Sequence, residues 1–538
     1  MIDRLRECGL RDFTYIDDET VTTCVRPEEL SQILRCLILR AGLHFSTCVG
    51  VDVRGLGEQG IEIYYIVSGK KLRLLLRTSV APSEKIEVPL DLPCTYWCLH
   101  EARDLVGLNL RNEVYTYRFV LPDSYPRSVC PLRKDYQYSE RPLTKCVQEM
   151  PTRPEKAITL FPHIPYFYEH EDFIVYVDVD KIVDFEYRGF YNHRGIEKVG
   201  ETRLKADQVP FIAERICGIC GYTHSCAYCQ AVESALRIDI PESARLTRTL
   251  LLEVERIESH LLWLAILCYM INLRDLFLKL MRCREHVMSM GEILTGNRKM
   301  YGINVIGGVR DFITSERIEK AARLFSELKT QCTKLLQELK SSERLRAATR
   351  GVGTLSREDA LITGAVGPVA RASGIDYDVR KYLPYAAYSQ VSFSIPVYSE
   401  GDVYSRALVR IDETLESIDI IDQVLGMSRA LLEKPHRSEY EWLPCRVGVG
   451  MTEAPRGEDV HFIITGHDLR LYRWRVRAPT YANLPSLWKS LIGEKLEHAN
   501  LIIASIDPCL ACTDRLVVVD TGLGKVRKIT RLVEVREA

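Results

Sequence analysis

Two Cys-x-x-Cys pairs that stand far apart in the chain constrain its fold most strongly. Cys217 and Cys220 lie in "RICGICGYTHSC", and Cys509 and Cys512 lie in "DPCLACTDR". Two cysteines at this spacing let both sulfurs converge on one ion from a tight turn, and Gly218 gives the first turn backbone freedom. Zinc ribbons place their pairs within about 20 residues of each other. The long separation here therefore predicts a fold that brings both segments to one central site.

The remaining cysteines indicate a reducing compartment. The chain has 18 cysteines, and its N-terminus, "MIDRLRECGLRDF", lacks the apolar region of an export signal. Thiols used as metal ligands or core residues are expected, rather than a disulfide framework. Cys226 and Cys229 fall in a helix-like segment without glycine, "SCAYCQAVESAL", and are predicted to be small buried residues. The others show no iron–sulfur spacing: Cys8, Cys24, Cys36, Cys48, Cys94, Cys98, Cys130, Cys146, Cys268, Cys283, Cys332 and Cys445.

Length and charge exclude several classes of protein. A chain of 538 residues exceeds the size of a single core, so two or three domains are expected. A net charge of −1 with well-mixed signs argues against a nucleic-acid partner. The longest apolar run, residues 261–271, is shorter than the roughly 20 residues that a membrane span needs. Attachment to a membrane would therefore depend on partner subunits.

The hydrophobic pattern predicts an α+β multidomain protein. Residues 1–121 are expected to form a small α/β domain, with a helix within "PEELSQILRCLILRAG" and two strands joined at a Ser-Gly turn. The polar, proline-bearing residues 122–156 are a linker or docking arm, and residues 157–515 form a large, mainly helical domain that opens on the strand-like "DFIVYVDVDKIVDFEY". Further helices are expected near 315–342 and 402–434. One stripe predicts a long helix after Pro241: Leu250, Val254, Ile257, Leu261 and Leu264.

Four segments resemble the active-site motifs of nickel–iron hydrogenase large subunits. They are "RICGICGYTH", "EAPRGE" (453–458), "APTYANLP" (478–485) and "DPCLACTDR". The resemblance runs from about residue 157 to the end and is strongest with the membrane-bound, complex I-related group, particularly the formate hydrogenlyase type. "PLRKDY" (131–136) and "YWCLHEARDLVGL" (96–108) resemble the small hydrophilic subunit of complex I, which that type carries as a fused N-terminal domain.

The resemblance implies a metal centre in the middle of the large domain. Cys217 and Cys509 would be terminal nickel ligands, and Cys220 and Cys512 would bridge nickel to an iron that carries carbon monoxide and cyanide. Thiolates suit nickel because they are soft donors. Three residues match positions that line the pocket for the iron ligands: Arg456, Pro479 and Thr480.

The expected chemistry is the reversible, heterolytic cleavage of H2, or the reduction of protons to H2. Four thiolates in a buried site require cationic neighbours, and Arg215 and Arg456 are the candidates because arginine stays charged. In the family the terminal thiolate that corresponds to Cys509 accepts the proton.

Several further residues take their expected roles from the resemblance. His224 would donate a hydrogen bond to a bridging sulfur, and Asp507 matches an acid near the metals. Glu169 would carry protons away, although Glu171 is an alternative. Ser259 stands where an acid is often found, which puts part of the usual polar surroundings in doubt.

The C-terminal motif departs from the family at Arg515, where many members have a histidine that holds magnesium together with a glutamate matching Glu197. An arginine pairs with a carboxylate but cannot ligate a cation, so a Glu197–Arg515 salt bridge is expected in place of magnesium. Residues 516–538 are expected to be removed by cleavage between Arg515 and Leu516. A permanent β-hairpin is the alternative for this segment.

The implied partners are an iron–sulfur small subunit, which would carry the clusters, integral membrane subunits, a maturation endopeptidase and nickel chaperones. The implied location is cytoplasmic, on the inner face of the membrane, with coupling to an oxidoreductase such as formate dehydrogenase. Two other interpretations remain open. The chain could be a complex I-type scaffold that contacts a quinone and binds no metal, or a structural zinc protein with four cysteine ligands. Neither explains the four cysteines together with Arg456 and His224.

Overall fold

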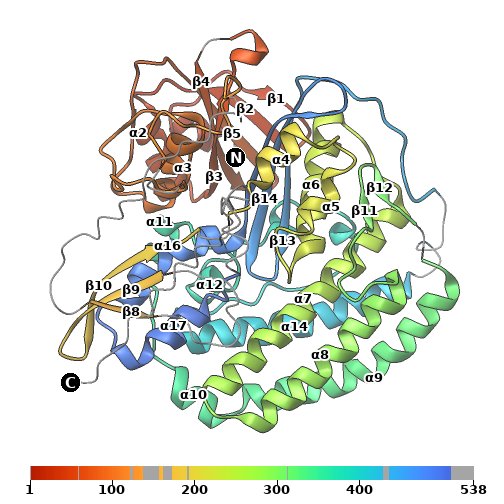
Figure 1. Cartoon of the computed structure of the whole chain (residues 1–538). Helices are drawn as coiled ribbons and strands as arrows, with labels where there is room; N and C mark the ends of the chain where they lie inside the picture. Colours follow the sequence, from red (N-terminus) through yellow and green to blue (C-terminus); the bar gives the residue numbers. More distant parts are fainter. Residues whose placement is uncertain are drawn as a thin grey trace, which may run out of the picture.

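The structure is a computed structural model that describes residues 2–58, 60–121, 125–136, 157–160, 172–190, 193–311, 313–427, 430 and 435–509, without the side chains of 157–160, 172 and 188. Figure 1 shows an N-terminal domain built around a sheet, a larger body of helices, and a second sheet that lies between them. The α+β multidomain class predicted from the sequence is confirmed.

The N-terminal domain is built on a five-stranded sheet in the order β1-β2-β5-β4-β3. Its strands are β1 (Thr14–Tyr15), β2 (Thr20–Cys24), β3 (His44–Asp52), β4 (Ile61–Gly69) and β5 (Leu72–Val80). β4 and β5 are the predicted pair joined after Ser68 and Gly69. Only β2 and β5 run parallel in this sheet. The helix α3 (Tyr96–Val106), formed by the "YWCLHEARDLVGL" segment, packs against β3.

The helix expected within residues 27–42 is shorter than predicted. It begins at Leu30 as α2 (Leu30–Arg35) and widens into a π-helical turn, η1 (Cys36–Arg40). Cys36 is joined to Cys8 by a disulfide, which corrects the expectation that both are core thiols. The bond ties the turn to α1 (Ile2–Glu7), and its partners are brought together by the tertiary fold rather than by their spacing in the sequence. The domain also contains η2 (Arg54–Leu56), β6 (Ile86–Glu87), η3 (Pro93–Thr95) and β7 (Leu110–Arg111).

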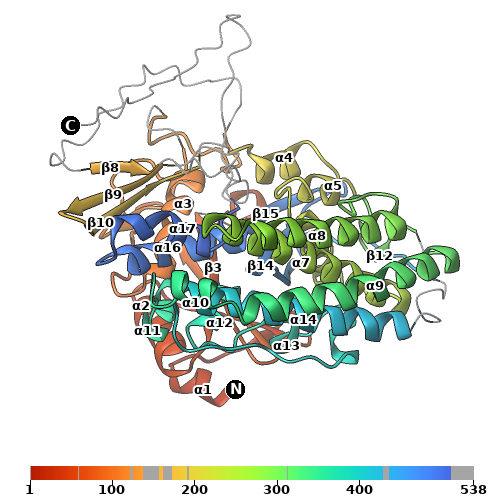
Figure 2. The ribbon, with the colours of Figure 1, turned by 90° about the horizontal axis from the view of Figure 1, so that it is seen from below.

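Four long helices form the body of the large domain and lie side by side in Figures 1 and 2. They are α7 (Glu242–Met270), α8 (Arg274–Thr295), α9 (Ser315–Lys340) and α14 (Val403–Gly426). The predicted stripe on α7 is buried along its length, and the helix begins directly after Pro241. In the part of the chain that the structure describes, no helix combines the length and apolarity of a membrane span. Shorter elements connect the layers: α4 (Ile196–Thr202), α5 (Val209–Ala213), α10 (Glu343–Thr349), α11 (Arg357–Thr363), α12 (Gly367–Ala372), α13 (Val379–Tyr382), η4 (Tyr388–Gln390), β11 (Asn304–Val305) and β12 (Gly308–Val309).

A three-stranded antiparallel sheet lies within the domain that was predicted to be mainly helical. Its strands are β13 (Val447–Ala454), β14 (Gly457–Thr465) and β15 (Leu471–Arg477). The helix α6 (Gly221–Leu236) packs across β13 and β14. This packing joins the first cysteine motif, at the start of α6, to the "EAPRGE" segment, at the turn between β13 and β14.

Two glycines on β13 allow α6 to lie directly on the sheet. A Cβ atom on Gly448 would overlap the carbonyl oxygen of Ala231, and one on Gly450 would overlap the carbonyl oxygen of Ala227. Because residues two apart on a strand face the same side, both glycines meet successive turns of α6. The sheet and the helix therefore approach more closely than any side chain would permit.

Substitution of Gly450 by alanine is expected to lower the apparent melting temperature by roughly 5 °C or more, because the atoms in the way belong to the backbone and cannot turn aside. The clash includes the amide nitrogen of Ala231, which would lie 2.6 Å from the new Cβ. Thermal unfolding followed by circular dichroism measures the change. Gly426→Ala is the matched control, since a Cβ there would meet nothing within 4 Å and alanine favours the helix. Equal melting temperatures for the two variants would contradict this account of the packing.

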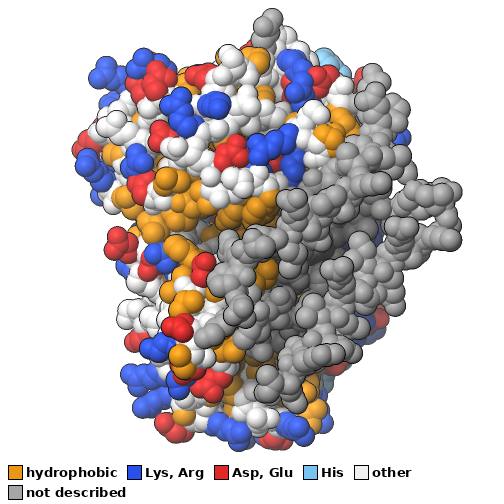
Figure 3. Space-filling view, turned by 60° about the vertical axis from the view of Figure 1, so that its left-hand side comes forward, with side chains coloured by type: hydrophobic (Ala, Val, Ile, Leu, Met, Phe, Trp, Pro, Cys, Tyr) orange, Lys and Arg blue, Asp and Glu red, His pale blue; other side chains and the backbone are white. Residues whose placement is uncertain are grey.

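The strand-like stretch that opens the large domain is an antiparallel hairpin. β9 (Asp172–Asp178) pairs with β10 (Lys181–Arg188) and with β8 (Ala157–Leu160), and the sheet packs on α16 (Pro479–Leu491). Val179 and Val183 on the hairpin and Trp488 and Ile492 near the end of α16 are exposed. Figure 3 shows hydrophobic side chains gathered in a band across one face of the molecule.

Candidate metal centre

The first cysteine pair lies in the turn between α5 and α6. Cys220 is the N-cap residue of α6, and both cysteines are completely buried. The Sγ of Cys217 accepts hydrogen bonds from the backbone N–H groups of Ile219 and Cys220, at 3.3 and 3.2 Å. Two N–H donors aimed at one sulfur stabilise a thiolate, which is the form that binds metal.

The glycine that this turn requires is Gly221. The sequence suggests Gly218 instead, on the ground of backbone freedom. Gly218 does not adopt a left-handed backbone, and a Cβ atom there would meet nothing within 4 Å. A Cβ atom on Gly221 would instead overlap the carbonyl oxygen of Glu214 and would lie 2.5 Å from the ring of Tyr301. Close packing, and not an unusual backbone conformation, is what this turn demands.

The second cysteine segment follows α17 (Ala499–Ser505) and reaches the first one. Asp507 takes a left-handed conformation, with φ of 55°, which aspartate tolerates better than most residues. The turn delivers Cys509 so that its Sγ lies 3.1 Å from the Sγ of Cys217, which itself lies 3.0 Å from the Sγ of Cys220. We call these three residues the cysteine cluster. Cys512 lies outside the described residues.

The "APTYANLP" segment, at the start of α16, hydrogen-bonds to the backbone of both Cys509 and Arg456. Pro479 occupies the first turn of the helix, and the hydroxyl oxygen of Thr480 accepts the backbone N–H of Cys509 at 3.0 Å. The side-chain amide of Asn483 donates to the carbonyl oxygen of Arg456 at 3.1 Å. Thr480, predicted to line the pocket, thus contacts Cys509, and Pro479 precedes it at the first turn of the helix; Asn483 was not predicted.

Arg456 is the buried cation beside the cysteine cluster. It lies in the two-residue turn between β13 and β14. Such turns are usually at the surface, but Arg456 is buried. Its guanidinium donates to the carboxylate of Asp507 at 2.8 Å, to the carbonyl oxygen of the same residue at 2.7 Å and to the hydroxyl of Ser259 at 3.2 Å. Burial alone would lower the pKa of Arg456, but Asp507 and the three cysteines raise it, so the positive charge persists.

Arg215, the other predicted cation, has its described contacts at the surface of the turn and not in the buried cluster. Its side chain is 54% exposed and pairs with Glu214 at 2.8 Å. The guanidinium also donates to the carbonyl oxygen of Phe211 and lies over the ring of Tyr301. Of the two predicted cations, Arg456 is therefore the one that is buried with the cysteine cluster, whereas the role of Arg215 toward the thiolates stays a prediction.

Glu197 is held by two arginines of β15. Its carboxylate accepts from Arg473 at 2.8 Å and from Arg475 at 3.1 Å, and from the N–H of Val476 at 3.0 Å. Burial raises the pKa of Glu197, but Arg473 and Arg475 lower it by more, so that the pKa lies below its usual value. Arg515 lies outside the described residues, so the predicted Glu197–Arg515 pair stays a prediction.

The arginines of β15 also join the two domains. Arg473 donates to the carbonyl oxygen of Gly50, Arg475 pairs with Glu101 of α3 at 2.8 Å, and Arg477 donates to the carbonyl oxygen of Ser46. In the docking arm, Lys134 pairs with Glu201 at 3.0 Å. The N-terminal domain is thereby fixed against the strand that leads into Pro479 and Thr480.

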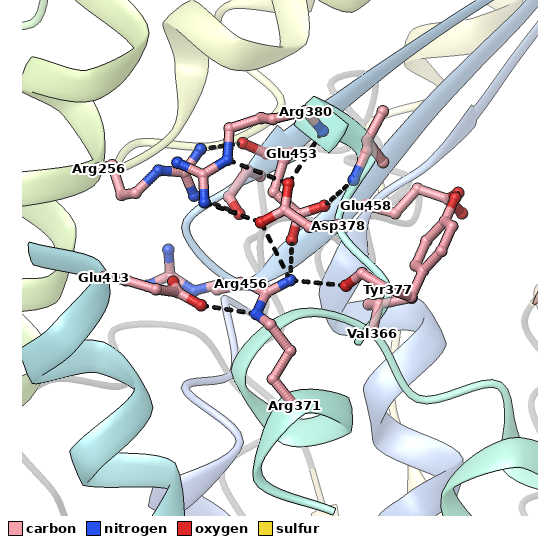
Figure 4. Close-up of polar contacts among 12 residues, drawn as sticks. Arg256, Val366, Arg371, Tyr377, Asp378, Arg380, Glu413, Glu453, Arg456 and Glu458 are labelled. Carbon is pink, nitrogen blue, oxygen red and sulfur yellow. Dashed lines mark hydrogen bonds and ion pairs between the residues drawn. The ribbon is translucent and has the colours of Figure 1, made fainter. Parts of the chain in front are cut away.

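A network of buried charged residues lies next to the turn that carries Arg456 (Figure 4). Arg371 donates to Glu413 at 2.7 Å and to Glu453 at 2.9 Å, and Arg380 pairs with Asp378 at 2.8 Å. The network continues through Arg256 and Glu253, and the imidazole of His260 is bonded to Glu413. Arg256 donates to the carbonyl oxygens of Glu453 and Ala454, so the network anchors the turn. His260 is thus part of this buried network.

His224 is completely buried one helical turn after Cys220. Its Nδ1 lies 2.9 Å from the carboxylate of Asp459 and 3.2 Å from Nε2 of His461. Burial lowers the pKa of His224, but Asp459 and the Cys217 thiol raise it above its usual value. Asp459 and His461 were not predicted, although the alternation of β14 after "EAPRG" places both on one face of the strand.

Glu255 of α7 is another residue that the sequence reasoning missed. Its carboxylate accepts hydrogen bonds from the backbone N–H groups of Tyr222 and Thr223 at 2.8 and 3.0 Å, and so caps α6, whose first residue is Gly221. Burial raises the pKa of Glu255 to about 7. Glu169 and Glu171, the candidates for proton transfer, lie outside the described residues.

The donor set fits a soft or borderline metal such as nickel or zinc better than a hard cation. Thiolates favour soft and borderline metals, and oxygen ligands for calcium or magnesium are not part of the cysteine cluster as described. A buried guanidinium against the sulfurs offsets a strongly negative centre. A structural zinc site requires no such cation.

Three family models match the chain in separate parts. The model described as "Nickel-dependent hydrogenase" matches residues 194–271. The "Respiratory-chain NADH dehydrogenase, 49 Kd subunit" model matches residues 274–444 and 437–515, and the 30 Kd subunit model matches residues 23–142. The order of these matches agrees with the predicted fusion of a complex I-like N-terminal domain to a hydrogenase domain.

Whole-chain relatives carry hydrogenase names. Formate hydrogenlyase subunit 5 of Escherichia coli K12 is 36% identical over 96% of this chain and 93% of its own length. Hydrogenase-4 component G of the same strain is 36% identical over 93% of this chain and 89% of its length. A chain in the solved structure of the membrane-bound sulfane sulfur reductase, an archaeal respiratory membrane complex, is 28% identical, with a TM-score of 0.63, over 67% of this chain and 98% of its own. The chain therefore belongs to the family of nickel–iron hydrogenase large subunits, in the membrane-bound, complex I-related group, and it is an oxidoreductase of that family.

Proposed function

We propose that Cys217, Cys220, Cys509 and Cys512 hold a nickel ion and an iron ion, the iron carrying carbon monoxide and cyanide. The observation that carries this proposal is the convergence of three buried sulfurs from segments 292 residues apart: the Sγ of Cys217 lies 3.1 Å from that of Cys509 and 3.0 Å from that of Cys220. When bound, the metal pair supplies the place where H2 is split heterolytically or formed from protons.

The side chains around the metals prepare that chemistry. Cys509 takes up the proton, and the bond from its N–H to Thr480 fixes the position of its backbone. Arg456 holds positive charge against the sulfurs, and Asp507 orients its planar fork. The hydrophobic side chain of Ala478 is buried with the cysteines, so that water is kept from the site. Glu169 carries the proton onward.

The chain works within a membrane-attached complex. Support comes from its relatives, which are components of formate hydrogenlyase and hydrogenase-4 and a chain of an archaeal respiratory membrane complex. An iron–sulfur subunit takes up or delivers the electrons, and integral membrane subunits hold the assembly at the inner face of the membrane. Formate dehydrogenase is the proposed electron donor, and magnesium is not required at Glu197, whose carboxylate is already paired with arginines.

Exchange between H2 and D2O in the purified complex tests this function. The complex is expected to catalyse exchange, and membranes that contain it are expected to evolve H2 from formate. Exchange without formate-dependent evolution would overturn the proposed donor only. A purified complex that contains no nickel and catalyses no exchange would favour the scaffold interpretation instead.

Cleavage after Arg515 is expected in the nickel-loaded protein. The match to the 49 Kd subunit model ends at residue 515, and a tail that is removed after metal insertion would let the last cysteine segment close over the site. Intact mass spectrometry of the nickel-loaded subunit should give a chain that ends at Arg515, and the nickel-free subunit should retain residues 516–538. A nickel-loaded subunit with the full mass of 61.6 kDa would contradict the expectation. Maturation in this scheme needs an endopeptidase and nickel chaperones.

A further inference from the structure

A cleft rich in basic residues lies where the docking arm meets the large domain. It encloses about 430 Å³ and is lined from three segments: the docking arm, α4 with the residue that follows it, and the turn between β14 and β15. Four lining residues are basic: Lys134, Lys198, Arg203 and Arg470. Among the described residues that line the cleft, Glu201 alone is acidic. The cleft therefore carries a surplus of positive charge.

The charge of Glu201 is already shared between two cations. Its carboxylate accepts hydrogen bonds from Nζ of Lys134 at 3.0 Å, from Arg473 at 3.1 Å and from the backbone N–H of Trp474 at 3.1 Å. Lys134 also lies over the ring of Tyr472, with Nζ 4.3 Å from the ring centre. These contacts fix Lys134 and Glu201 in the wall of the cleft. Since this carboxylate already faces two cations, it does not offset the charge of the other basic residues.

Lys198 is the lining residue whose burial most favours an anionic ligand. It is only 8% exposed, and a buried ammonium group is costly unless it faces negative charge. Burial lowers the pKa of Lys198, and the cations Lys134 and Arg473 lower it further, while Glu201 and Asp52 oppose them. Asp52 in turn accepts the backbone N–H of Lys134 at 2.8 Å. An anion in the cleft would stabilise the charged form of Lys198.

The arrangement of the basic residues suits a phosphate group better than a carboxylate. A phosphate group presents three acceptor oxygens in different directions, whereas a carboxylate presents two, and the basic residues reach the cleft from three segments. Arg470 is held by a hydrogen bond from its guanidinium to the carbonyl oxygen of Thr202 at 3.0 Å, which uses one of its five N–H donors. The planar fork of an arginine matches the geometry of phosphate.

We propose that this cleft binds a phosphate-bearing anion, either free or as the headgroup of a lipid, through Lys198, Arg203 and Arg470. The anion would lie between the docking arm and α4, where Lys134 and Arg473 meet at Glu201. It would therefore reinforce the joint between the N-terminal domain and the strand β15. The site is separate from the cysteine cluster and does not depend on the metals of the proposed function.

Calorimetric titration of the purified full-length chain with inorganic phosphate, at constant ionic strength in chloride, tests the proposal. A dissociation constant of roughly 1 mM or tighter is expected, which corresponds to two or three charge-assisted hydrogen bonds. Phosphate is also expected to raise the melting temperature, because it binds the folded state alone. Acetate is the probe for an acidic segment of a partner protein. Equal affinity for acetate and phosphate, or no binding of phosphate, would overturn the proposal.

Variants at the two ends of the cleft show whether binding takes place there. Lys198→Met keeps an unbranched side chain without its charge, and Arg470→Gln changes an exposed residue, so its effect does not depend on core packing. Each is expected to weaken phosphate binding by about 10- to 100-fold. Arg323→Gln is the matched control, because this arginine of α9 is 79% exposed and does not line the cleft. Wild-type affinity in either cleft variant would overturn the proposal.

Vesicles distinguish a lipid headgroup from a free anion. The full-length chain is mixed with vesicles of phosphatidylcholine, with and without phosphatidylglycerol, and sedimented. Sedimentation that requires phosphatidylglycerol and is lost in Arg470→Gln would assign the ligand to a lipid headgroup. Binding of soluble phosphate without such sedimentation would assign it to a free anion, and both results support the shared chemistry. Sedimentation with phosphatidylglycerol that is equal in the wild type, Lys198→Met and Arg470→Gln would place anion binding elsewhere and overturn the proposal.

Discussion

Replacing Cys509 with serine is expected to remove nickel from the subunit and to lower H2/D2O exchange by more than about 100-fold. Removing a residue that only hydrogen-bonds to a metal ligand typically costs about 10- to 100-fold, and the loss of a ligand itself should cost more. Serine keeps the size of the side chain and the bond from the N–H of residue 509 to Thr480. A hydroxyl stays protonated near neutral pH and is a poor ligand for a soft metal. The loss would therefore report ligation rather than folding. Metal analysis and exchange measure it on the same sample.

Cys229→Ala is the matched control for this experiment. Cys229 belongs to a second Cys-x-x-Cys pair, within α6, and is as deeply buried as the cluster. Burial raises its pKa well above the usual value, so it is a neutral thiol rather than a ligand. The control is expected to retain nickel and exchange. Full nickel content in Cys509→Ser would contradict the assignment, as would loss of nickel in Cys229→Ala without loss of fold.

Arg456→Leu is expected to destabilise the subunit by about 3–5 kcal/mol, because it leaves the carboxylate of Asp507 buried without its partner. Exchange activity should also fall by about 100-fold or more, as it does when a preorganised group that stabilises charge is removed. Unfolding in denaturant measures the first effect, and H2/D2O exchange on the remaining folded complex measures the second.

A double variant separates these two effects. Asp507→Asn removes the unpaired charge, and asparagine tolerates the left-handed backbone at this position. Arg456→Leu/Asp507→Asn should therefore regain most of the stability but none of the activity. If the double variant regained both, Arg456 would serve the fold alone, and the sulfurs would not need its charge.

Local sequence patterns predicted the long helices and strands, and short motifs predicted part of the candidate metal site. The stripe on α7 follows from helical spacing alone, and the meeting of Cys217 with Cys509 follows from two metal-binding pairs that require one site. Thr480 and Arg456, which two short motifs singled out, contact Cys509 and Asp507 respectively. In these cases the chemistry of a few neighbouring residues leaves one reasonable arrangement.

Partners from distant elements could not be predicted in the same way. Arg215 stands two residues before Cys217 in the motif, but its side chain is half exposed and pairs with Glu214. The arginines of β15 alternate in "LYRWRVR", which indicates a strand with one charged face, but nothing local shows that Glu197 and Glu101 meet that face. The Cys8–Cys36 disulfide depends on how α1 packs. Trp474 and His461 likewise come within hydrogen-bond distance only when β14 and β15 are aligned.

X-ray absorption at the nickel edge of the purified complex tests the central claim most directly, namely that two cysteine pairs far apart in the sequence enclose one nickel ion. The account predicts a nickel shell of four sulfur ligands with an iron neighbour, and loss of sulfur from that shell in Cys509→Ser. A nickel shell of nitrogen and oxygen, zinc in place of nickel, or no bound metal in an active complex would contradict it.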